Sequence, residues 1–318
     1  MAIKKLRDEL LTHAETVERV RREAKVLASV LHQNVCHVYD FVETPSESFI
    51  LMEFIEGIDV STAVQKVGHL PPDIAAGILL GVAKGVSYIH THHLIHRDIK
   101  PSNIRLTTRG EVKLMDFGIV MELENKSLTR PGMMVGSPSY LSPEQVLGDP
   151  IGPTADVFLL GITLYEMLTG TKPFRDEANE TVFQRIREAK YIPARDMNKA
   201  LPRSLDAIVS KCLKKRVEDR YQTVKELISD LEKFLGPKAS VSTEDMLLKY
   251  LDEEALVTPT VPYSQMEKGR DFFLNYLSWK VVAAGVLILL LTGGVGYWLG
   301  SQNVSKPVTP SQSIFIQK

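Results

Sequence analysis

Residues 96–103 read HRDIKPSN and place a carboxylate, a lysine and an amide within one short polar stretch. The triplet DFG, which begins with Asp116, follows a few residues later. Mg²⁺ binds hard oxygen ligands, and the carboxylate of Asp116 and the amide of Asn103 supply them. Asp98 can orient an attacking hydroxyl and accept its proton, while Lys100 can place positive charge on a transferring phosphate. The two motifs together predict a centre of phosphoryl transfer.

The two motifs resemble the catalytic loop H-R-D-L-x-x-x-N and the metal-binding D-F-G of the protein kinases, with Ile99 in the leucine position. Over residues 1 to about 235 the chain is similar to the bacterial serine/threonine kinases of eukaryotic (Hanks) type. The resemblance implies an α+β, bilobal protein kinase fold, with a small N-lobe sheet and a mainly helical C-lobe. It also implies ATP- and Mg²⁺-dependent transfer of a γ-phosphate to Ser or Thr hydroxyls of protein substrates in signalling.

The same resemblance assigns nucleotide-binding residues to the N-lobe. The initial strand, MAIK, matches the V-A-I-K motif, so Lys4 would contact the α- and β-phosphates of ATP. Glu23, on the helical pattern that follows, would hold Lys4 in place through an ion pair. At the hinge, the carbonyl of Glu53 and the backbone of Ile55 would bind adenine, and Asp59 would reach the ribose.

Residues 119–141 are polar and resemble the activation segment, which would end at the triplet SPE that contains Glu144. Ser127 and Thr129 are candidate phosphorylation sites, although a role as plain loop residues remains equally open for both. Arg97, which precedes the catalytic aspartate, could pair with an added phosphate and so order the segment.

Four residues would have structural roles in the C-lobe. His96 would pack in the core beneath the catalytic loop. Asp156, at the start of an apolar helix over residues 156–170, would hold the catalytic-loop backbone by hydrogen bonds. Arg220 would be the buried ion-pair partner of Glu144.

Hydrophobic periodicity and turn signals predict the regular elements of the chain. Strands are expected at residues 1–4, 35–41 and 48–54, and helices at residues 14–31, 71–91, 156–170, 224–235 and near 243–251. The glycine and proline at residues 236–237 predict the end of the globular domain.

The composition excludes some classes of function. The chain has 318 residues, of which 38 are basic and 39 acidic, so it lacks the basic excess that is typical of nucleic-acid binders. Its two cysteines, Cys36 and Cys212, lie far apart in the sequence and form no motif. They indicate a reducing compartment without a disulfide framework.

Residues 281–300, VVAAGVLILLLTGGVGYWLG, carry no charge and would span roughly 30 Å as a helix, which matches the hydrocarbon core of a membrane. More basic residues precede this stretch than follow it, which places the N-terminal side in the cytoplasm. A GxxxG pattern at residues 296–300 permits close helix approach and hence a homodimer. The expected organisation is a kinase domain at 1–236, a juxtamembrane linker at 237–280, a single helix through the inner membrane at 281–300 and an extracytoplasmic tail at 301–318.

The glycine-rich loop that precedes the lysine strand in protein kinases is absent from the sequence, which starts at that strand. Either the natural start lies upstream of Met1, or the N-lobe sheet lacks two strands. Two hypotheses of function follow. The first is an active serine/threonine kinase, and the alternative is a membrane-anchored, catalytically impaired pseudokinase that serves as a scaffold.

Overall fold

The structure is a computed structural model, which describes residues 1–6, 18, 21–22, 24, 26–44, 47–116, 138–236 and 243–256. The chain divides into two compact units, Met1–Thr258 and Pro259–Lys318, and every described residue belongs to the first unit. The expected membrane span at 281–300 and the phosphosite candidates Ser127 and Thr129 therefore lie outside the described residues.

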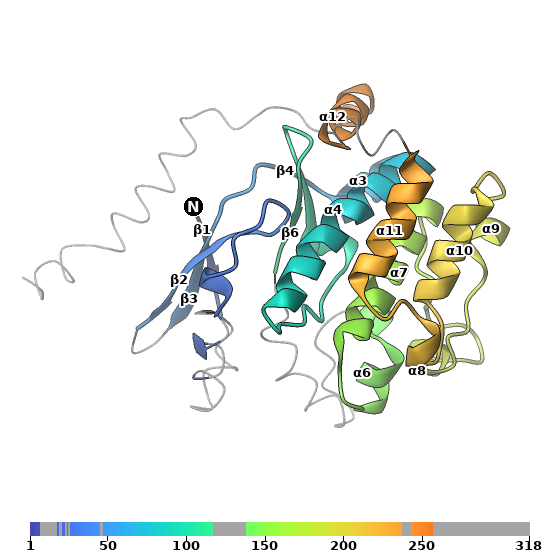
Figure 1. Cartoon of the computed structure of the whole chain (residues 1–318), viewed down its shortest axis with the longest axis horizontal. Coiled ribbons are helices and arrows are strands. Elements are labelled where there is room, and N and C mark those ends of the chain that lie inside the picture. Colours follow the sequence, from blue (N-terminus) through green and yellow to red (C-terminus); the bar gives the residue numbers. More distant parts are fainter. Residues whose placement is uncertain are drawn as a thin grey trace, which may run out of the picture. The chain divides into compact units, whose positions relative to one another are not determined.

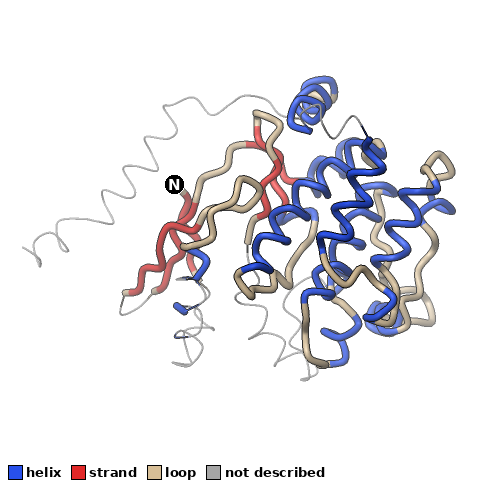
Figure 2. The backbone as a smooth tube through the Cα atoms, in the orientation of Figure 1, coloured by secondary structure: helices blue, strands red, loops and turns tan. Residues whose placement is uncertain are grey.

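The first sheet is antiparallel, with its strands in the order β1-β3-β2 (Figures 1 and 2). Its strands are β1 (Ala2–Lys5), β2 (Val38–Glu43) and β3 (Ser48–Met52). Burial alternates along β3, as the two-residue period of a strand requires, so that Ile50 and Met52 point into the core. Lys4 pairs with Ile50 across the ladder and so projects from the same face. The sheet therefore presents Lys4 on its packed side.

The second sheet is antiparallel, with its strands in the order β4-β5-β6. Its strands are β4 (Gly57–Asp59), β5 (Ile104–Thr107) and β6 (Val112–Leu114). Gly57 has a φ of 148°, and a Cβ atom there would lie 2.0 Å from the carbonyl oxygen of Leu106. Only glycine fits this close approach between neighbouring strands. The β5–β6 hairpin directly follows Asn103 and ends two residues before Asp116.

Outside the two sheets the described domain is mainly helical. Helices α4, α7, α10 and α11 lie side by side there and form its core (Figure 1). The main helices are α3 (Val60–Val67), α4 (Pro72–Thr91), α7 (Pro153–Thr169), α10 (Arg203–Cys212), α11 (Val224–Leu235) and α12 (Thr243–Glu253). The short elements are η1 (Pro101–Asn103), η2 (Pro138–Tyr140), α6 (Pro143–Leu147), α8 (Val182–Arg187), α9 (Ala194–Met197) and η3 (Val217–Asp219). Nearly every residue of α7 is buried, so this helix is the centre of the core.

Within the described part of the chain, α4 is the one helix long and apolar enough to cross a membrane by length and composition. Two thirds of its most apolar stretch are buried by other elements, which is the pattern of a core helix. Two glycines of α4 allow segments on other elements to lie close to this helix. A Cβ atom at Gly81 would lie 3.0 Å from the side chain of Val112, and one at Gly85 would lie 3.0 Å from the carbonyl oxygen of Asn34.

The segment around Asn34 joins the two sheets. The amide of Leu114 donates to the carbonyl of Asn34 at 2.9 Å, and the amide of Cys36 donates to the carbonyl of Leu114 at 2.8 Å. The side chain of Asn34 also donates to the carbonyl of Val112 at 2.9 Å. These bonds tie the segment that leads into β2 to strand β6.

A buried ion pair links the region after the activation segment to the C-terminal helices. Arg220, 2% exposed, donates to both carboxylate oxygens of Glu144 at 2.8 and 3.0 Å. The same guanidinium donates to the backbone carbonyls of Thr154, Lys214 and Lys215. Such full hydrogen bonding is what makes a buried ion pair tolerable.

The expected elements differ from the observed ones mainly at their ends. The helix expected at 156–170 begins at Pro153, because proline at the first helical position has no N–H to leave unpaired. The strand expected from residue 35 begins at Val38, while Val35 forms an isolated bridge with Leu114. In the segment 14–31, the described residues 18, 21–22, 24 and 26–28 are helical.

The compact unit also continues past residue 236, where the sequence places the end of the domain, because α12 packs against α4.

Candidate active site

The catalytic-loop segment is held by one buried carboxylate. Asp156, in the first turn of α7 and 0% exposed, accepts the backbone N–H of His96 at 2.9 Å and that of Arg97 at 2.8 Å. His90, near the end of α4, contacts the same carboxylate at 2.8 Å. Arg97 has a φ of 66°, a conformation that costs free energy for a residue other than glycine. The two hydrogen bonds to Asp156 hold the backbone in this conformation.

His96 is fully buried and connects the catalytic loop to the segment that carries Asp116. Its Nε2 lies 3.1 Å from the carbonyl of Met115, and its Nδ1 accepts from the amide of Asp98 at 3.4 Å. Burial lowers the pKa of His96, because the imidazolium would lose its hydration, while Asp156 and Asp98 act in the opposite direction. A neutral ring with its proton on Nε2 satisfies both contacts.

Asp98 lies at the centre of a cluster formed by the loop itself. The ammonium of Lys100 lies 2.8 Å from each carboxylate oxygen of Asp98. The side-chain amide of Asn103 donates to a carboxylate oxygen of Asp98 at 2.8 Å and to its carbonyl at 2.9 Å. These contacts hold the carboxylate in one orientation and leave the amide oxygen of Asn103 available for a further ligand.

Asp116 lies between the two sheets. Its carboxylate pairs with the ammonium of Lys4 at 2.7 Å, and both side chains are more than a third exposed. The backbone beside it is fixed, because the amide of Met115 donates to the carbonyl of Asn103 at 2.7 Å. Asp116 has a φ of 45°, a conformation that aspartate tolerates better than most residues. The structure thus brings Lys4, Asp98, Asn103 and Asp116 into one region at the junction of the two sheets.

The predicted hinge residues follow β3. The amide of Glu53 donates to the carbonyl of His37 at 2.8 Å, and its carboxylate pairs with Lys113 at 3.0 Å. The carbonyl of Ile55 accepts from Arg105 Nε at 3.1 Å. A carbonyl has two lone pairs, so this bond still permits a second donor.

Asp59 caps a helix, and its expected contact with the ribose stays a prediction. Its carboxylate caps α3, where it accepts the amide of Thr62 at 2.8 Å and the hydroxyl of Thr62 at 2.7 Å. An aspartate at this position satisfies a helix N–H that would otherwise lack a partner. Each carboxylate oxygen can accept a second hydrogen bond, so this cap permits a ribose contact as well.

Three predicted residues cannot be placed. Glu23, Ser127 and Thr129 lie outside the described residues, and so do Phe117 and Gly118 of the DFG triplet.

Some contacts near the site were not expected from the sequence. The hydroxyl of Tyr140 donates to the carboxylate of Glu166 at 2.5 Å, and burial raises the pKa of both groups. A carboxylate near the C-terminal end of the apolar helix α7 is the signal that could have revealed this pair, because a buried carboxylate needs a donor. No sequence pattern indicates the contacts of Lys113 and Arg105 with the hinge, because these contacts depend on the pairing of β5 with β6.

The donors at the junction suit a hard metal ion. Asn103 and Asp116 offer an amide oxygen and a carboxylate oxygen, which are the ligands that Mg²⁺ prefers. Within the described ranges no group of three or more His, Cys, Asp and Glu side chains could hold a metal by itself. A Mg²⁺ ion that shares its coordination with substrate phosphates needs only one or two protein ligands, so the residues fit this ion.

This arrangement of two sheets, core helices and catalytic loop is that of a protein kinase domain. A sequence model described as "Protein kinase domain" matches residues 1–231, and the chain belongs to this family. The α+β bilobal kinase fold expected from the sequence is thereby confirmed.

Several curated relatives are bacterial. The chain is 36% identical over 245 residues to the probable serine/threonine-protein kinase CPE1738 of Clostridium perfringens, a match that covers 77% of this chain and 36% of that protein. It is 36% identical to the serine/threonine-protein kinase PknB of Mycobacterium leprae, over 73% of this chain and 38% of that protein. It is 33% identical to the serine/threonine-protein kinase PrkC of Bacillus subtilis, over 73% of this chain and 36% of that protein. The match thus spans little more than a third of the length of each of these relatives.

A solved structure has the same fold. The crystal structure of Rad53 1-466 in complex with AMP-PNP matches with a TM-score of 0.60 and 22% sequence identity, over 72% of this chain and 56% of that one. At this identity the likeness concerns the fold alone.

We expect Asp156→Asn to lower the free energy of unfolding by about 2–4 kcal/mol, because one buried N–H of the catalytic loop would face an amide N–H₂ instead of an oxygen. Urea denaturation of the purified chain measures this loss.

Thr163→Val is the matched control on the same helix. Thr163 is 0% exposed, and its hydroxyl has no hydrogen-bond partner within the described part of the chain. Removal of this hydroxyl should change stability by less than about 1 kcal/mol. Equal losses in the two variants would contradict the anchoring role of Asp156.

Proposed function

We propose that this domain transfers the γ-phosphate of ATP to Ser or Thr hydroxyls of protein substrates. The observation that carries the proposal is the cluster of Asp98, Lys100 and Asn103, held on α7 by Asp156 and facing Asp116 and Lys4. Membership of the protein kinase family and the serine/threonine kinase relatives support the same reaction. Phosphoryl transfer requires mainly positioning and charge stabilisation, which such a rigid cluster of charged groups supplies.

Each residue of the cluster has a proposed part in the reaction. Asp98 orients the attacking hydroxyl and accepts its proton. Lys100, now paired with Asp98, stabilises negative charge on the transferring phosphate. Asn103 and Asp116 hold Mg²⁺, which neutralises charge on the phosphates when bound.

The nucleotide would rearrange the contacts of Lys4. Without nucleotide, Lys4 and Asp116 neutralise each other across 2.7 Å. When Mg²⁺–ATP is bound, Asp116 would hold its metal ion and the ammonium of Lys4 would contact its phosphates. Glu23 would hold Lys4 through an ion pair. The carbonyl of Glu53 and the backbone of Ile55 would bind adenine, and Asp59 would reach the ribose.

Two further parts of the proposal rest on the sequence alone. Ser127 and Thr129 are sites of regulatory phosphorylation, with Arg97 as the partner of the added phosphate. Residues 281–300 anchor the chain in the membrane, with the kinase domain in the cytoplasm and a homodimer formed through the GxxxG pattern.

Asp98→Asn should abolish transfer of labelled phosphate from ATP to a general protein substrate, because the amide cannot accept the proton of the hydroxyl. Ser102→Ala is the control, since Ser102 is exposed within the same loop and should retain wild-type activity. If the wild-type chain binds Mg²⁺–ATP and transfers no phosphate, the scaffold hypothesis replaces this proposal.

Lys4→Met should lower kcat/KM for ATP by at least about a hundredfold, because the phosphates lose a preorganised cation. Steady-state kinetics with varied ATP measures this loss.

Lys5→Met is the matched control for that experiment. Lys5 is the next residue of β1, projects from the opposite face and pairs with Glu47 at 2.7 Å. This variant should keep its kcat/KM within about twofold of wild type, since an exposed ion pair contributes little. A similar loss in both variants would show that charge near β1, and not the position of Lys4, supports activity.

If residues 281–300 anchor the chain, the full chain should stay in the membrane pellet after extraction with alkaline carbonate. An uncharged stretch of this length inserts across the bilayer, and such extraction removes only peripheral proteins. Replacement of Leu289 and Leu290 by arginine should release the protein, because charges near the middle of a span oppose insertion. Complete release of the wild-type chain would contradict the anchor.

A further inference from the structure

Helix α12 lies beyond the residues that match the protein kinase family, which end at residue 231. It is nevertheless folded onto the domain at the N-terminal end of α4, next to the turn between β5 and β6 (Figure 1). Four apolar side chains of α12 and the residues after it are buried, namely those of Leu247, Tyr250, Leu251 and Leu256. Lys249, Asp252 and Glu253 are exposed on the other side of the helix. The helix therefore has one docking face and one free face.

The domain meets this docking face at two glycines. Gly110, in the β5–β6 turn, has a φ of 79°, and a Cβ atom there would lie 2.2 Å from the carbonyl oxygen of Glu244. On α4, a Cβ atom at Gly77 would lie 2.7 Å from the terminal methyl of Met246 and 3.0 Å from that of Thr243. The backbone of α12 thus rests directly on the turn of the hairpin.

The β5–β6 hairpin connects this contact to the active site. Its first strand follows Asn103 without a gap, and its second strand ends two residues before Asp116. At the open end of the hairpin, the amide of Met115 donates to the carbonyl of Asn103. Whatever fixes the turn at Gly110 therefore also limits the motion of both proposed Mg²⁺ ligands.

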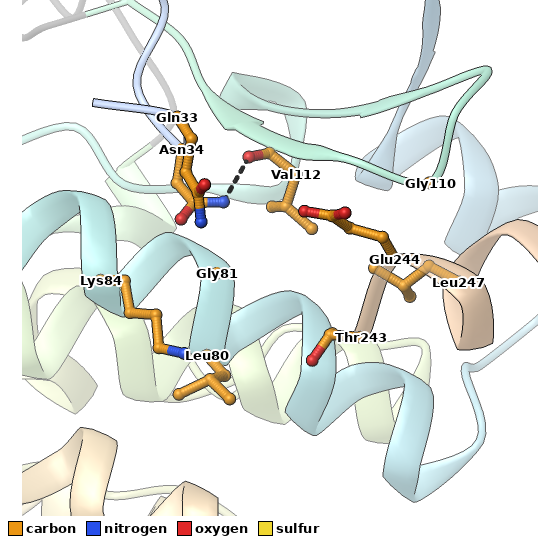
Figure 3. A pocket seen from close by; sticks show the side chains of 10 residues that line it. All are labelled: Gln33, Asn34, Leu80, Gly81, Lys84, Gly110, Val112, Thr243, Glu244 and Leu247. Carbon is orange, nitrogen blue, oxygen red and sulfur yellow. Dashed lines mark hydrogen bonds between the residues drawn. The ribbon is translucent and has the colours of Figure 1, made fainter. Parts of the chain in front are cut away.

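The docking of α12 is incomplete on one side. A cavity of about 190 Å³ remains between its first turn, α4 and the Asn34 segment (Figure 3). Asn34, 8% exposed, lines this cavity, and its side-chain oxygen has no hydrogen-bond partner in the part of the chain that the structure describes. Lys84 and Glu244 also line the cavity, which is therefore polar enough to hold water.

The energetics favour a reversible contact. Four buried apolar side chains stabilise the docked helix, while the ordering of residues 243–256 opposes docking. The two contributions oppose each other, and the cavity beside the first turn reduces the apolar area that docking buries. Opposing contributions of this kind allow a docked and a released state to exchange, which is what a regulatory element requires.

We propose that α12 is a docking strap that binds the surface formed by α4 and the β5–β6 turn, and thereby positions Asn103 and Asp116 for Mg²⁺–ATP. The proposal rests on the proposed kinase function for the role of these two residues. Docked α12 holds the hairpin in the binding geometry. Released α12 leaves the turn free and weakens the binding of Mg²⁺–ATP.

The test uses the full chain with the double substitution Leu247→Asp and Leu251→Asp, which places two carboxylates in the docking face. Hydrogen exchange should become faster in residues 243–256 and also in residues 104–116. The KM for Mg²⁺–ATP should rise at least about fivefold, with kcat little changed, because the strap acts on binding geometry and not on Asp98. Lys249→Asp, at a side chain of α12 that is 77% exposed, should behave as wild type in every measurement.

Faster exchange in 243–256 without any change in 104–116, or without any change in KM, would overturn the proposal. If the double variant does not fold, Gly77→Leu releases α12 from the α4 side, and the same outcomes apply to it. If the wild-type chain transfers no phosphate, the proposed function fails, but hydrogen exchange and the binding of a Mg²⁺–nucleotide still decide whether the strap exists.

Discussion

The site depends on the buried carboxylate of Asp156. This one side chain accepts two consecutive backbone N–H groups, from His96 and Arg97, and so fixes the point from which Asp98 projects. Arg97 has a left-handed backbone conformation that would not persist without such support. Because nearly every residue of the helix that carries Asp156 is buried, the position of the catalytic loop is set by the core itself.

The second constraint is the β5–β6 hairpin. It carries Asn103 before its first strand and Asp116 after its second, and the bond from Met115 to Asn103 closes its open end. His96 reaches the same segment through the carbonyl of Met115. The catalytic loop and the proposed metal ligands are therefore parts of one hydrogen-bonded unit. The ion pair between Lys4 and Asp116 then joins this unit to the first sheet.

Short motifs in the sequence predicted the residues of this unit, because local chemistry determines their types. The HRD and DFG motifs predict Asp98 and Asp116, and an acidic residue at the start of an apolar helix points to Asp156. The pairing of Lys113 with Glu53 could not be predicted, since it joins β6 to the segment after β3, which lies 60 residues away in the sequence. The cap that Asp59 forms on Thr62 is a short-range contact, while its contact with the ribose stays a prediction of the family resemblance.

The position of α12 on the domain could not be predicted from the sequence either. A helix near residues 243–251 was expected, but as part of a linker, because its amphipathic pattern does not say which surface it covers. The partner surface consists of Gly77 and Gly110, which come together only in the fold. Glycines that permit two elements to approach closely add nothing to the hydrophobic periodicity of the sequence. A docking site built on them can therefore be identified only from the structure.

Amide hydrogen exchange at His96 and Arg97 tests the central claim most directly. If Asp156 anchors the catalytic loop to the core, these two amides should exchange only through global unfolding, as slowly as the amides in the middle of α7. Exchange as fast as that of exposed, unstructured amides would contradict the account, because the loop would then open independently of the core.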